Sequence, residues 1–337
     1  MKSQRVLVLM HPDLLPPDSR EGHSEQDADS WKTEYDVVTT LRGLGHEVQP
    51  LGVQDELRPV REAIETWNPT IVFNLLEEFH RNILYDQNVV SYLELLQIPY
   101  TGCNPRGLVI ARSKALCKKL LTYHRIHVPA FAVFALHRSV RRPRRLQFPL
   151  IVKSLTEHGS LGISQASIVD SDEKLAERVA FVHERLRTDA IAEQFIEGRE
   201  YYVSILGNDR LLALPVWELV FENMPANAAL IATEKVKHDV AYQKRRGIFQ
   251  RVAEDLPEAL AARITRTSKR IYRILELDGY ARIDYRLAAD GSLHFLDANP
   301  NPEIAESEEL AMAAKYIGMT YPELLTRVLN LGLRRSA

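Results

Sequence analysis

The chain has 337 residues, of which 45% are apolar and 26% charged, which is the composition of an ordinary globular protein with room for two or three domains. Its formal net charge of −2 argues against a protein whose whole surface is built to bind nucleic acid. The two cysteines, Cys103 and Cys117, are too few for a disulfide scaffold and lack metal-like spacing, which predicts a reducing, cytoplasmic location.

The first residues contain an apolar run of only five residues, Val6 to Met10, and no small-residue cleavage pattern follows it. This run predicts a buried first strand rather than a secretion signal. No window approaches the roughly 20 apolar residues that a membrane-spanning helix needs. We therefore expect a protein that acts without a membrane.

The first hundred residues alternate between strand and helix patterns. Strands are predicted at 6–10, 47–51, 70–74 and 98–100, and helices at 31–44, 61–67 and 87–96. This alternation predicts a parallel sheet covered by helices. No Gly-x-Gly-x-x-Gly follows the first strand, so the dinucleotide fingerprint is absent. The polar, Pro-rich segment 11–30 is predicted to be a long loop over a strand end, where such sheets bind ligands.

In the middle of the chain, Ser113 is predicted to cap a helix, and the basic run 138–145 is typical of a solvated loop. The predicted elements here are a helix at 114–124, strands at 130–134 and 148–153, and a helix at 171–187. Lys153 ends an apolar strand, where a lysine is buried unless an anion meets it, so a ligand phosphate would suit it.

Gly159 and Gly162 flank a loop that follows this strand and leads into a further predicted strand. Its backbone N–H groups can fold over phosphates. On its own, such a loop is more often an ordinary turn. Together with Lys153 and the acidic hairpin described next, it becomes much stronger evidence for a phosphate site.

The chemical centre of the chain is a predicted hairpin at 281–299 with an Asp290-Gly291 turn, preceded by strands at 201–206 and 211–216 and a helix at 257–277. If its loop is 289–292, Asp284 lies opposite Asp297. Two carboxylates about 5 Å apart repel each other unless a cation lies between them, and oxygen ligands suit magnesium. The alternative interpretation is a half-exposed hairpin with incidental charges.

The alternation of side chains along a strand predicts which residues of this hairpin share a face. The first arm would place Arg282, Asp284 and Arg286 together. The second arm would place together Leu293, Phe295, Asp297 and Asn299. Arg282 is then expected opposite Asn299.

In this order and with these spacings, the features resemble the ATP-grasp fold, and specifically its D-alanine:D-alanine ligase branch. The resemblance rests on the stretches 95–102, 114–119, 149–153 with its glycine loop, 193–200, and 282–284 with 297–299. It implies an α/β ATP-grasp fold in three parts. These are an N-terminal parallel α/β (pre-ATP-grasp) domain at 1–112, a central lid subdomain at 113–192, and a C-terminal subdomain with the metal site at 193–337.

The resemblance also implies an ATP-dependent carboxylate–amine ligase that forms an amide through an acyl phosphate. Its cofactors would be ATP and two Mg²⁺ ions, with Mn²⁺ as an alternative, held by Asp284, Asp297 and Asn299. Arg282 would stabilise the oxyanion when the amine attacks. The implied ATP contacts are Lys114, Lys153, His158, Gly159, Ser160, Gly162, Glu193, Gln194, Phe195, Ile196, Glu200, Leu296 and either Lys237 or Lys235, with Lys237 preferred. Glu193 to Ile196 would be the adenine-binding hinge and Glu200 the ribose contact.

The chain departs from the family at the segment after Asn299. Where the family has a glycine of the oxyanion hole and a serine that binds the second amino acid's carboxylate, this chain places Glu303 and Glu308, with Ser307 one step away. Together with Glu306 and Glu309, these charges favour a cationic acceptor, or an amine without a carboxylate nearby. The alternative is that the glutamates only open a helix, where acidic residues suit the dipole. Asp297 is also shorter than the family's usual glutamate.

The N-terminal domain offers further substrate candidates, each of which has the alternative of being a plain surface or core residue: Glu34, Glu77, Glu78, His80 and Asp86. The expected partners are a small carboxylate, such as an amino acid or peptide, and an amine, with a homodimer left open. The alternative functions are a true D-alanine:D-alanine ligase and a catalytically inactive ATP-binding regulatory module. A different ATP-grasp branch, such as a carboxylase, lacks a supporting motif.

Overall fold

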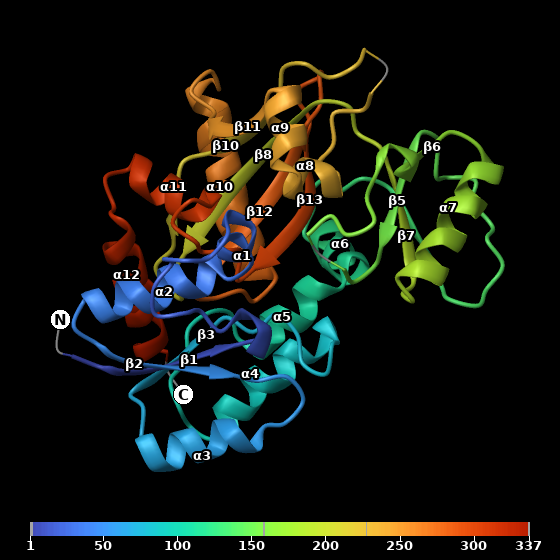
Figure 1. Ribbon diagram of the computed structural model, residues 1–337. Helices are drawn as coiled ribbons and strands as arrows, with labels where there is room; N and C mark the ends of the chain where they lie inside the picture. The colour runs from blue at the N-terminus through green and yellow to red at the C-terminus, as the bar shows by residue number, and fades with distance from the viewer. Residues whose placement is uncertain (1–2, 158, 227, 336–337) are drawn as a thin grey trace.

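The computed structural model describes residues 3–157, 159–226 and 228–335. Its strands form three sheets, which follow one another along the chain: a parallel sheet, a small antiparallel sheet and a large antiparallel sheet. The first and third stand together in the main body, and the second forms a lobe at the right of Figure 1. The predicted mixed α/β class is confirmed. The domain boundaries at 112 and 192 stay predictions.

The N-terminal sheet has the order β2-β1-β3, and both of its pairings are parallel, as predicted. Its strands are β1 (Arg5–Met10), β2 (Glu47–Gly52) and β3 (Ile71–Asn74). Because β1 is apolar on both faces, it is buried on both: Val6 and Val8 enter one core cluster, and Leu7 and Leu9 enter another. The helices of this region are α2 (Lys32–Gly43), α3 (Arg58–Trp67), α4 (Asp86–Leu95) and α5 (Pro105–Arg112).

Two predictions in this region are wrong in part. The segment 11–30 is not all loop, because it contains a 3₁₀ turn (Pro12–Leu14) and the short helix α1 (Glu25–Ser30). Ser24 and Asp27 form a capping box that starts α1, and this signal was overlooked. Of the strand predicted at 98–100, only an isolated bridge between Val72 and Tyr100 forms.

The middle sheet has the order β4-β7-β5-β6 and is antiparallel throughout. Its strands are β4 (Phe131–Phe134), β5 (Leu150–Ser154), β6 (Ile168–Val169) and β7 (Ala190–Gln194). Helix α7 (Asp172–Arg185) covers the sheet with an apolar stripe that includes Leu175 and Val179. The prediction that the glycine loop leads directly into a strand is wrong, because a 3₁₀ turn (Gln165–Ser167) follows the loop. Helix α6 (Lys114–Tyr123) precedes the sheet, and Ser113 caps it as predicted.

The large sheet has the path β11-β10-β8-β12-β13, with β9 paired to β8. Its strands are β8 (Arg199–Leu206), β9 (Leu212–Ala213), β10 (Trp217–Phe221), β11 (Ile248–Val252), β12 (Tyr280–Leu287) and β13 (Leu293–Pro300). The strand predicted at 211–216 therefore shrinks to β9. Helices α8 (Glu234–His238) and α9 (Val240–Arg246) lie between β10 and β11, and α10 (Glu258–Ile274) packs on β8 and β12.

The last two helices connect the large sheet to the first one. Helix α11 (Glu309–Tyr316) follows β13, and α12 (Tyr321–Leu333) packs against α2 and β3 at the N-terminal sheet. Figure 1 shows α12 beside α2, although they lie nearly 300 residues apart in the chain. Within the described residues, no helix has the length and apolar character that crossing a membrane requires.

The β12–β13 hairpin has the predicted register: Arg282 pairs with Asn299, and Asp284 pairs with Asp297. The predicted sharing of faces along β13 is wrong, because the register shifts just after Asp284 and the next pair is Tyr285 with Phe295. This bulge leaves Leu296 as an extra residue. As a result Phe295 is buried in the core, whereas Leu296 lines the pocket described below.

Candidate active site

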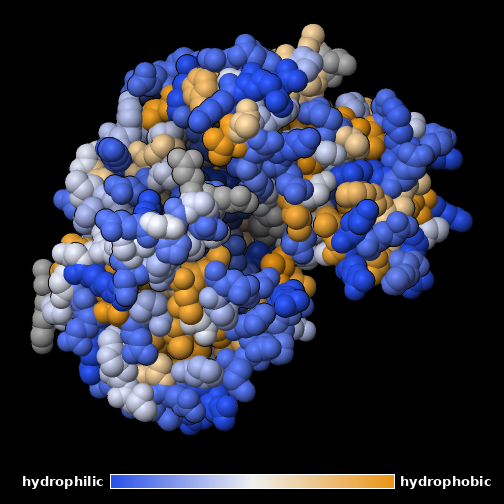
Figure 2. All heavy atoms as spheres, viewed as in Figure 1, coloured by the Kyte–Doolittle hydropathy of each residue, from blue (hydrophilic) through white to orange (hydrophobic). Residues whose placement is uncertain are grey.

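A pocket lies between the middle sheet and the large sheet, where the surface in Figure 2 is hollowed. Its walls come from β5, the end of β7 with the segment that follows, the β12–β13 hairpin, α8 and the glycine loop. Most predicted ATP and metal residues line it: Lys114, Lys153, Gly159, Ser160, Glu193, Gln194, Phe195, Ile196, Glu200, Lys237, Asp284, Leu296, Asp297 and Asn299. His158 lies outside the described residues.

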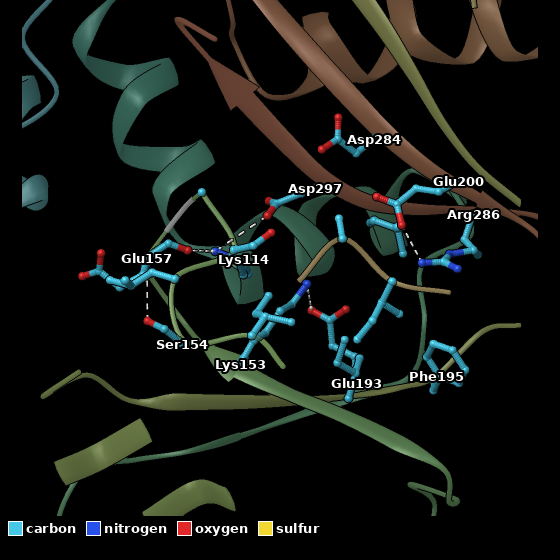
Figure 3. A pocket seen from close by; sticks show the side chains of 18 of the residues that line it. Lys114, Lys153, Ser154, Glu157, Glu193, Phe195, Glu200, Asp284, Arg286 and Asp297 are labelled. Carbon is cyan, nitrogen blue, oxygen red and sulfur yellow. Dashed lines mark hydrogen bonds and ion pairs between the residues drawn. The ribbon is translucent and has the colours of Figure 1, made fainter. Parts of the chain in front are cut away.

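Two lysines meet one carboxylate at the floor of this pocket. The Nζ of Lys153 lies 3.2 Å from Oε1 of Glu193, and the Nζ of Lys118 lies 3.4 Å from the same oxygen. Figure 3 shows Lys153 and Glu193 pointing toward each other from neighbouring strands. Burial opposes the charge of Lys153, but Glu193 and Asp297 outweigh it and raise its pKa.

Lys118 was missed by the sequence analysis, although it lies one helical turn after Lys114. It is fully buried, and its ammonium donates a hydrogen bond to the carbonyl of Leu296 at 2.7 Å. The Leu296 carbonyl belongs to the bulge of β13. Lys118 therefore connects the β12–β13 hairpin to Glu193 at the end of β7. Burial lowers the pKa of Lys118.

Lys114 lies at the start of α6, beside the glycine loop and the hairpin. Its Nζ donates to the backbone carbonyl of Glu157 at 2.5 Å and lies 3.7 Å from Oδ2 of Asp297. Lys237 of α8 also lines the pocket, and no carboxylate among the described residues forms an ion pair with it. Burial lowers its pKa, and Arg282 lowers it further. Lys235, the other candidate, is exposed and does not line the pocket.

The predicted metal residues adjoin one another on the hairpin. The carboxylate of Asp284 accepts hydrogen bonds from Arg282 Nε at 2.8 Å, Arg282 Nη2 at 3.0 Å and Asn299 Nδ2 at 2.9 Å. Oδ1 of Asp297 accepts from the N–H of Ala298 at 3.1 Å. These are hard oxygen donors that suit magnesium. The described residues hold no group of three or more His, Cys, Asp or Glu that could hold a metal ion.

Arg282 does not line the pocket wall itself but lies just behind Asp284. Its guanidinium stacks over the ring of Tyr202, 4.8 Å from the centroid. Glu309, at the start of α11, accepts a hydrogen bond from Ser204 at 2.8 Å and faces the charge of Arg282. Burial raises the pKa of Glu309 to about 7, against the attraction of Arg282.

The other end of the pocket contains Glu200 and a buried arginine that the sequence analysis did not assign. Arg286 Nη2 donates to Glu200 Oε2 at 2.5 Å, and Arg286 Nη1 donates to the carbonyl of Leu230 at 2.7 Å. Tyr202 donates to the other oxygen of Glu200 at 2.7 Å. Figure 3 shows this pair beside Phe195. The signal that was available is the shared face of Arg282, Asp284 and Arg286. Further lining residues that were missed are Ile151, Ser154, Glu157, Leu161, Ile163, Ile231 and Ala232.

The described part of the glycine loop is attached to α8 at both ends. The N–H of Gly162 donates to Glu234 Oε2 at 2.9 Å, and the ring of His238 lies 3.2 Å from the carbonyl of Gly159. Gly162 does not line the pocket, in contrast to Gly159 and Ser160. Gly159 and Gly162 have φ angles of 68° and 70°, a conformation that glycine adopts at little cost.

The substrate candidates separate into two groups. The first group consists of glutamates that raise one another's pKa. Glu77 and Glu303 raise the pKa of Glu34, and Glu308 and Glu77 raise the pKa of Glu303. Asp86 instead forms a buried ion pair with Arg112. His80 and Ser307 are exposed, and none of the candidate substrate residues lines the pocket. Glu78 lies 3.9 Å from the ring of His11.

The sequence is similar to those of known ligases. Residues 120–330 match the family model described as D-ala D-ala ligase C-terminus. The chain is 30% identical to the D-alanine–D-alanine ligase of Aquifex aeolicus over 97% of this chain and all of that one. It is 34% identical to the enzyme of the same name from Bordetella petrii over 73% of this chain and 71% of that one.

Solved structures show the same fold. The D-alanine–D-alanine ligase of Bacillus anthracis in complex with ATP has a TM-score of 0.76, with 23% identity over 98% of both chains. The VanG D-Ala:D-Ser ligase of Enterococcus faecalis has a TM-score of 0.70, with 17% identity over 98% of this chain and 100% of that one. From its sequence matches and its fold, the chain belongs to the D-alanine–D-alanine ligase family of ADP-forming ATP-grasp ligases.

Proposed function

We propose that this ligase joins the carboxylate of an amino acid or peptide to an amine, with the pocket between the two antiparallel sheets as its ATP site. The observation that carries the proposal is the charge pattern of that pocket. Lys114, Lys153 and Lys237 approach from three different elements, and the acidic hairpin faces them. Lys153 and Lys114 each have one carboxylate partner, and Lys237 has none among the described residues, so a polyphosphate would neutralise the positive charge that remains.

The nucleotide would lie along the pocket from the hinge to the hairpin. Gln194 to Ile196 would bind the adenine through backbone groups, and Glu200, oriented by Arg286 and Tyr202, would accept the ribose hydroxyls. Lys114, Lys153 and Lys237 would contact the phosphates. Gly159 and Ser160 would cover the phosphates with their backbone N–H groups.

Asp284, Asp297 and Asn299 would hold two Mg²⁺ ions, with Mn²⁺ as a substitute. When bound, these ions would neutralise the charge of the transferred phosphoryl group. For Asp284 to take part, Arg282 has to share its guanidinium, which now donates two hydrogen bonds to that carboxylate. N–H groups of Arg282 that no longer donate to Asp284 would then be free to donate to the reacting groups.

The reaction has two steps. A carboxylate oxygen of the first substrate attacks the γ-phosphorus, the bond to the leaving oxygen of ADP breaks, and an acyl phosphate forms. The amine nitrogen then attacks the acyl carbon, loses a proton, and expels phosphate. Arg282 would stabilise the oxyanion of the second step.

A phosphate-release screen tests this function. The chain, ATP and Mg²⁺ are combined with pairs of amino acids and amines, and the products are identified by mass spectrometry. We expect phosphate release that requires both substrates, together with an amide product. D-Alanine belongs in the screen because relatives carry the name D-alanine–D-alanine ligase. Tight ATP binding without turnover for any pair would favour the inactive regulatory module.

The glycine loop is expected to open and close over the nucleotide. Glu157 and the 44%-exposed Leu161 give cleavage sites for glutamyl endopeptidase and chymotrypsin. Cleavage at both sites should be suppressed by a non-hydrolysable ATP analogue with Mg²⁺. Tryptic cleavage in the basic segment 138–145 is the matched control and should not change. Equal loop cleavage with and without nucleotide would refute the lid.

Cellular location and assembly stay predictions. Both cysteines are free and buried. The homodimer is open to measurement by light scattering.

A further inference from the structure

Three carboxylates from distant parts of the chain converge beside the N-terminal sheet. Glu34 comes from α2, Glu77 from the segment after β3, and Glu303 from the segment after β13. Glu77 and Glu303 both raise the pKa of Glu34, and Glu77 also raises that of Glu303. We call these three residues the acidic triad.

The basic side chains near the triad are already engaged. Lys32 Nζ lies 2.7 Å from Glu308 Oε1, and its distance to Glu303 Oε1 is 3.7 Å. Arg112 forms its ion pair with Asp86 and also donates to the backbone carbonyl of Glu77. Lys32 is therefore shared between Glu308 and Glu303, and Arg112 is paired with Asp86, so the triad retains an excess of negative charge.

Glu34 is the strongest indication that something else belongs there. Its side chain is buried, with only 5% of the residue exposed, and no cation among the described residues lies within ion-pair distance. Burial, followed by the repulsion of Glu77 and Glu303, raises its pKa to about 7. A buried carboxylate without a cation is unfavourable, and a bound cation would relieve it.

The triad is within reach of both solvent and the reaction centre. Glu77 and Glu303 are exposed at the surface, so a ligand can enter. Glu303 follows Asn299 by only four residues, which limits their separation to about 14 Å. Asn299 lines the ATP pocket. A small extended molecule can therefore contact the triad and the acyl phosphate at once.

The structure also shows which of the glutamates after Asn299 are free to favour a cationic acceptor. Glu308 occupies the N-cap position of α11 without a capping hydrogen bond and pairs with Lys32. Glu309 is the first residue of α11 and accepts a hydrogen bond from Ser204, and Glu306 is exposed. Glu308 and Glu309 therefore lie at the start of a helix, as the alternative interpretation of these glutamates predicts. Of that segment, Glu303 alone remains as a charge of the triad.

We propose that the amine substrate carries a second positive group, which is bound by the acidic triad while the nucleophilic amine reaches the acyl phosphate. This inference rests on the proposed function and specifies its acceptor. An acceptor with a free carboxylate near that position would be repelled by Glu303. The chemical class that fits is a diamine, or an amino amide with a basic side chain.

Calorimetry on the chain loaded with a non-hydrolysable ATP analogue and Mg²⁺ tests the inference without knowledge of the first substrate. Unbranched diamines are titrated against monoamines of matching length and against D-alanine. We expect the best diamine to bind at least tenfold more tightly than its monoamine. In Glu34→Gln and Glu303→Gln this ratio should fall toward one. Glu306→Gln, from the same segment but outside the triad, should retain it.

The outcomes separate this inference from the proposed function. Failure of the ATP analogue to bind would refute the ATP site, whatever the amines do. Nucleotide binding with no diamine binding, with equal affinity for diamine and monoamine, or with a ratio unchanged in both glutamine variants would overturn the triad alone. If D-alanine binds best and Glu303→Gln leaves its affinity unchanged, the acceptor is a free amino acid.

Discussion

Asp297→Asn is expected to abolish turnover, with a loss of kcat of about a hundredfold or more, while the fold stays intact. The substitution conserves size, and the amide oxygen can still accept the hydrogen bond from Ala298. It removes one of the two negative charges that face the phosphates, along with the charge partner of Lys114 at 3.7 Å. Magnesium-dependent phosphate release measures the turnover, and thermal unfolding measures whether the fold is intact.

Asp290→Asn is the matched control for this experiment. Asp290 lies in the turn of the same hairpin, where it accepts a hydrogen bond from the N–H of Ser292, and it is exposed. Its variant should retain turnover. If Asp297→Asn retained full magnesium-dependent turnover, Asp297 would have no place in the metal site. Loss of both turnover and thermal stability would mean that the hairpin itself had changed.

The hairpin shows how far sequence patterns reach. The pairing of Arg282 with Asn299 and of Asp284 with Asp297 was predicted from the turn, which is a local property, whereas the alternation of faces along β13 was predicted wrongly. The bulge at Leu296 was not predicted, because one extra residue on one strand leaves no clear mark in an apolar run. Its cause is tertiary: Phe295 packs in the core, and the carbonyl of Leu296 accepts a hydrogen bond from the buried Lys118.

The pocket was predictable where chemistry and secondary structure coincide. Lys153 on an apolar strand and the glycines after it are visible in the sequence. The roles of Arg286 and Lys118 were harder to predict, because each forms an ion pair with a residue far along the chain. Arg286 pairs with Glu200, and Lys118 pairs with Glu193. An isolated lysine or arginine on an element resembles a surface charge until its partner is known.

The least predictable feature is the packing of α12 on the N-terminal sheet. Helix α12 has an ordinary apolar face, and nothing local indicates that this face meets α2 and β3. Glu303 and α11 also lie beside α2, as the ion pair between Lys32 of α2 and Glu308 shows. The acidic triad therefore arises from tertiary structure, although each of its carboxylates was a candidate in the sequence.

Lys153→Ala is expected to weaken binding of ATP about 10- to 100-fold, since a charge-assisted bond to phosphate contributes about 1.5 to 3 kcal/mol. Lys153 lines the pocket with only 11% of its side chain exposed, so few water molecules could replace its ammonium. Calorimetry with a non-hydrolysable ATP analogue measures the effect. Lys235→Ala is the control, because Lys235 is exposed outside the pocket and its removal should leave the affinity unchanged.

The ion pair between Lys153 and Glu193 complicates this result, because removal of the lysine also leaves a buried carboxylate with Lys118 as its remaining cation. The double variant Lys153→Ala with Glu193→Gln separates the two effects. If Lys153 contacts phosphate, the double variant should bind the analogue as weakly as the single one. If affinity returns to the original value, the loss came from the uncompensated charge of Glu193. Equal affinity in Lys153→Ala and the original chain would remove Lys153 from the phosphate site.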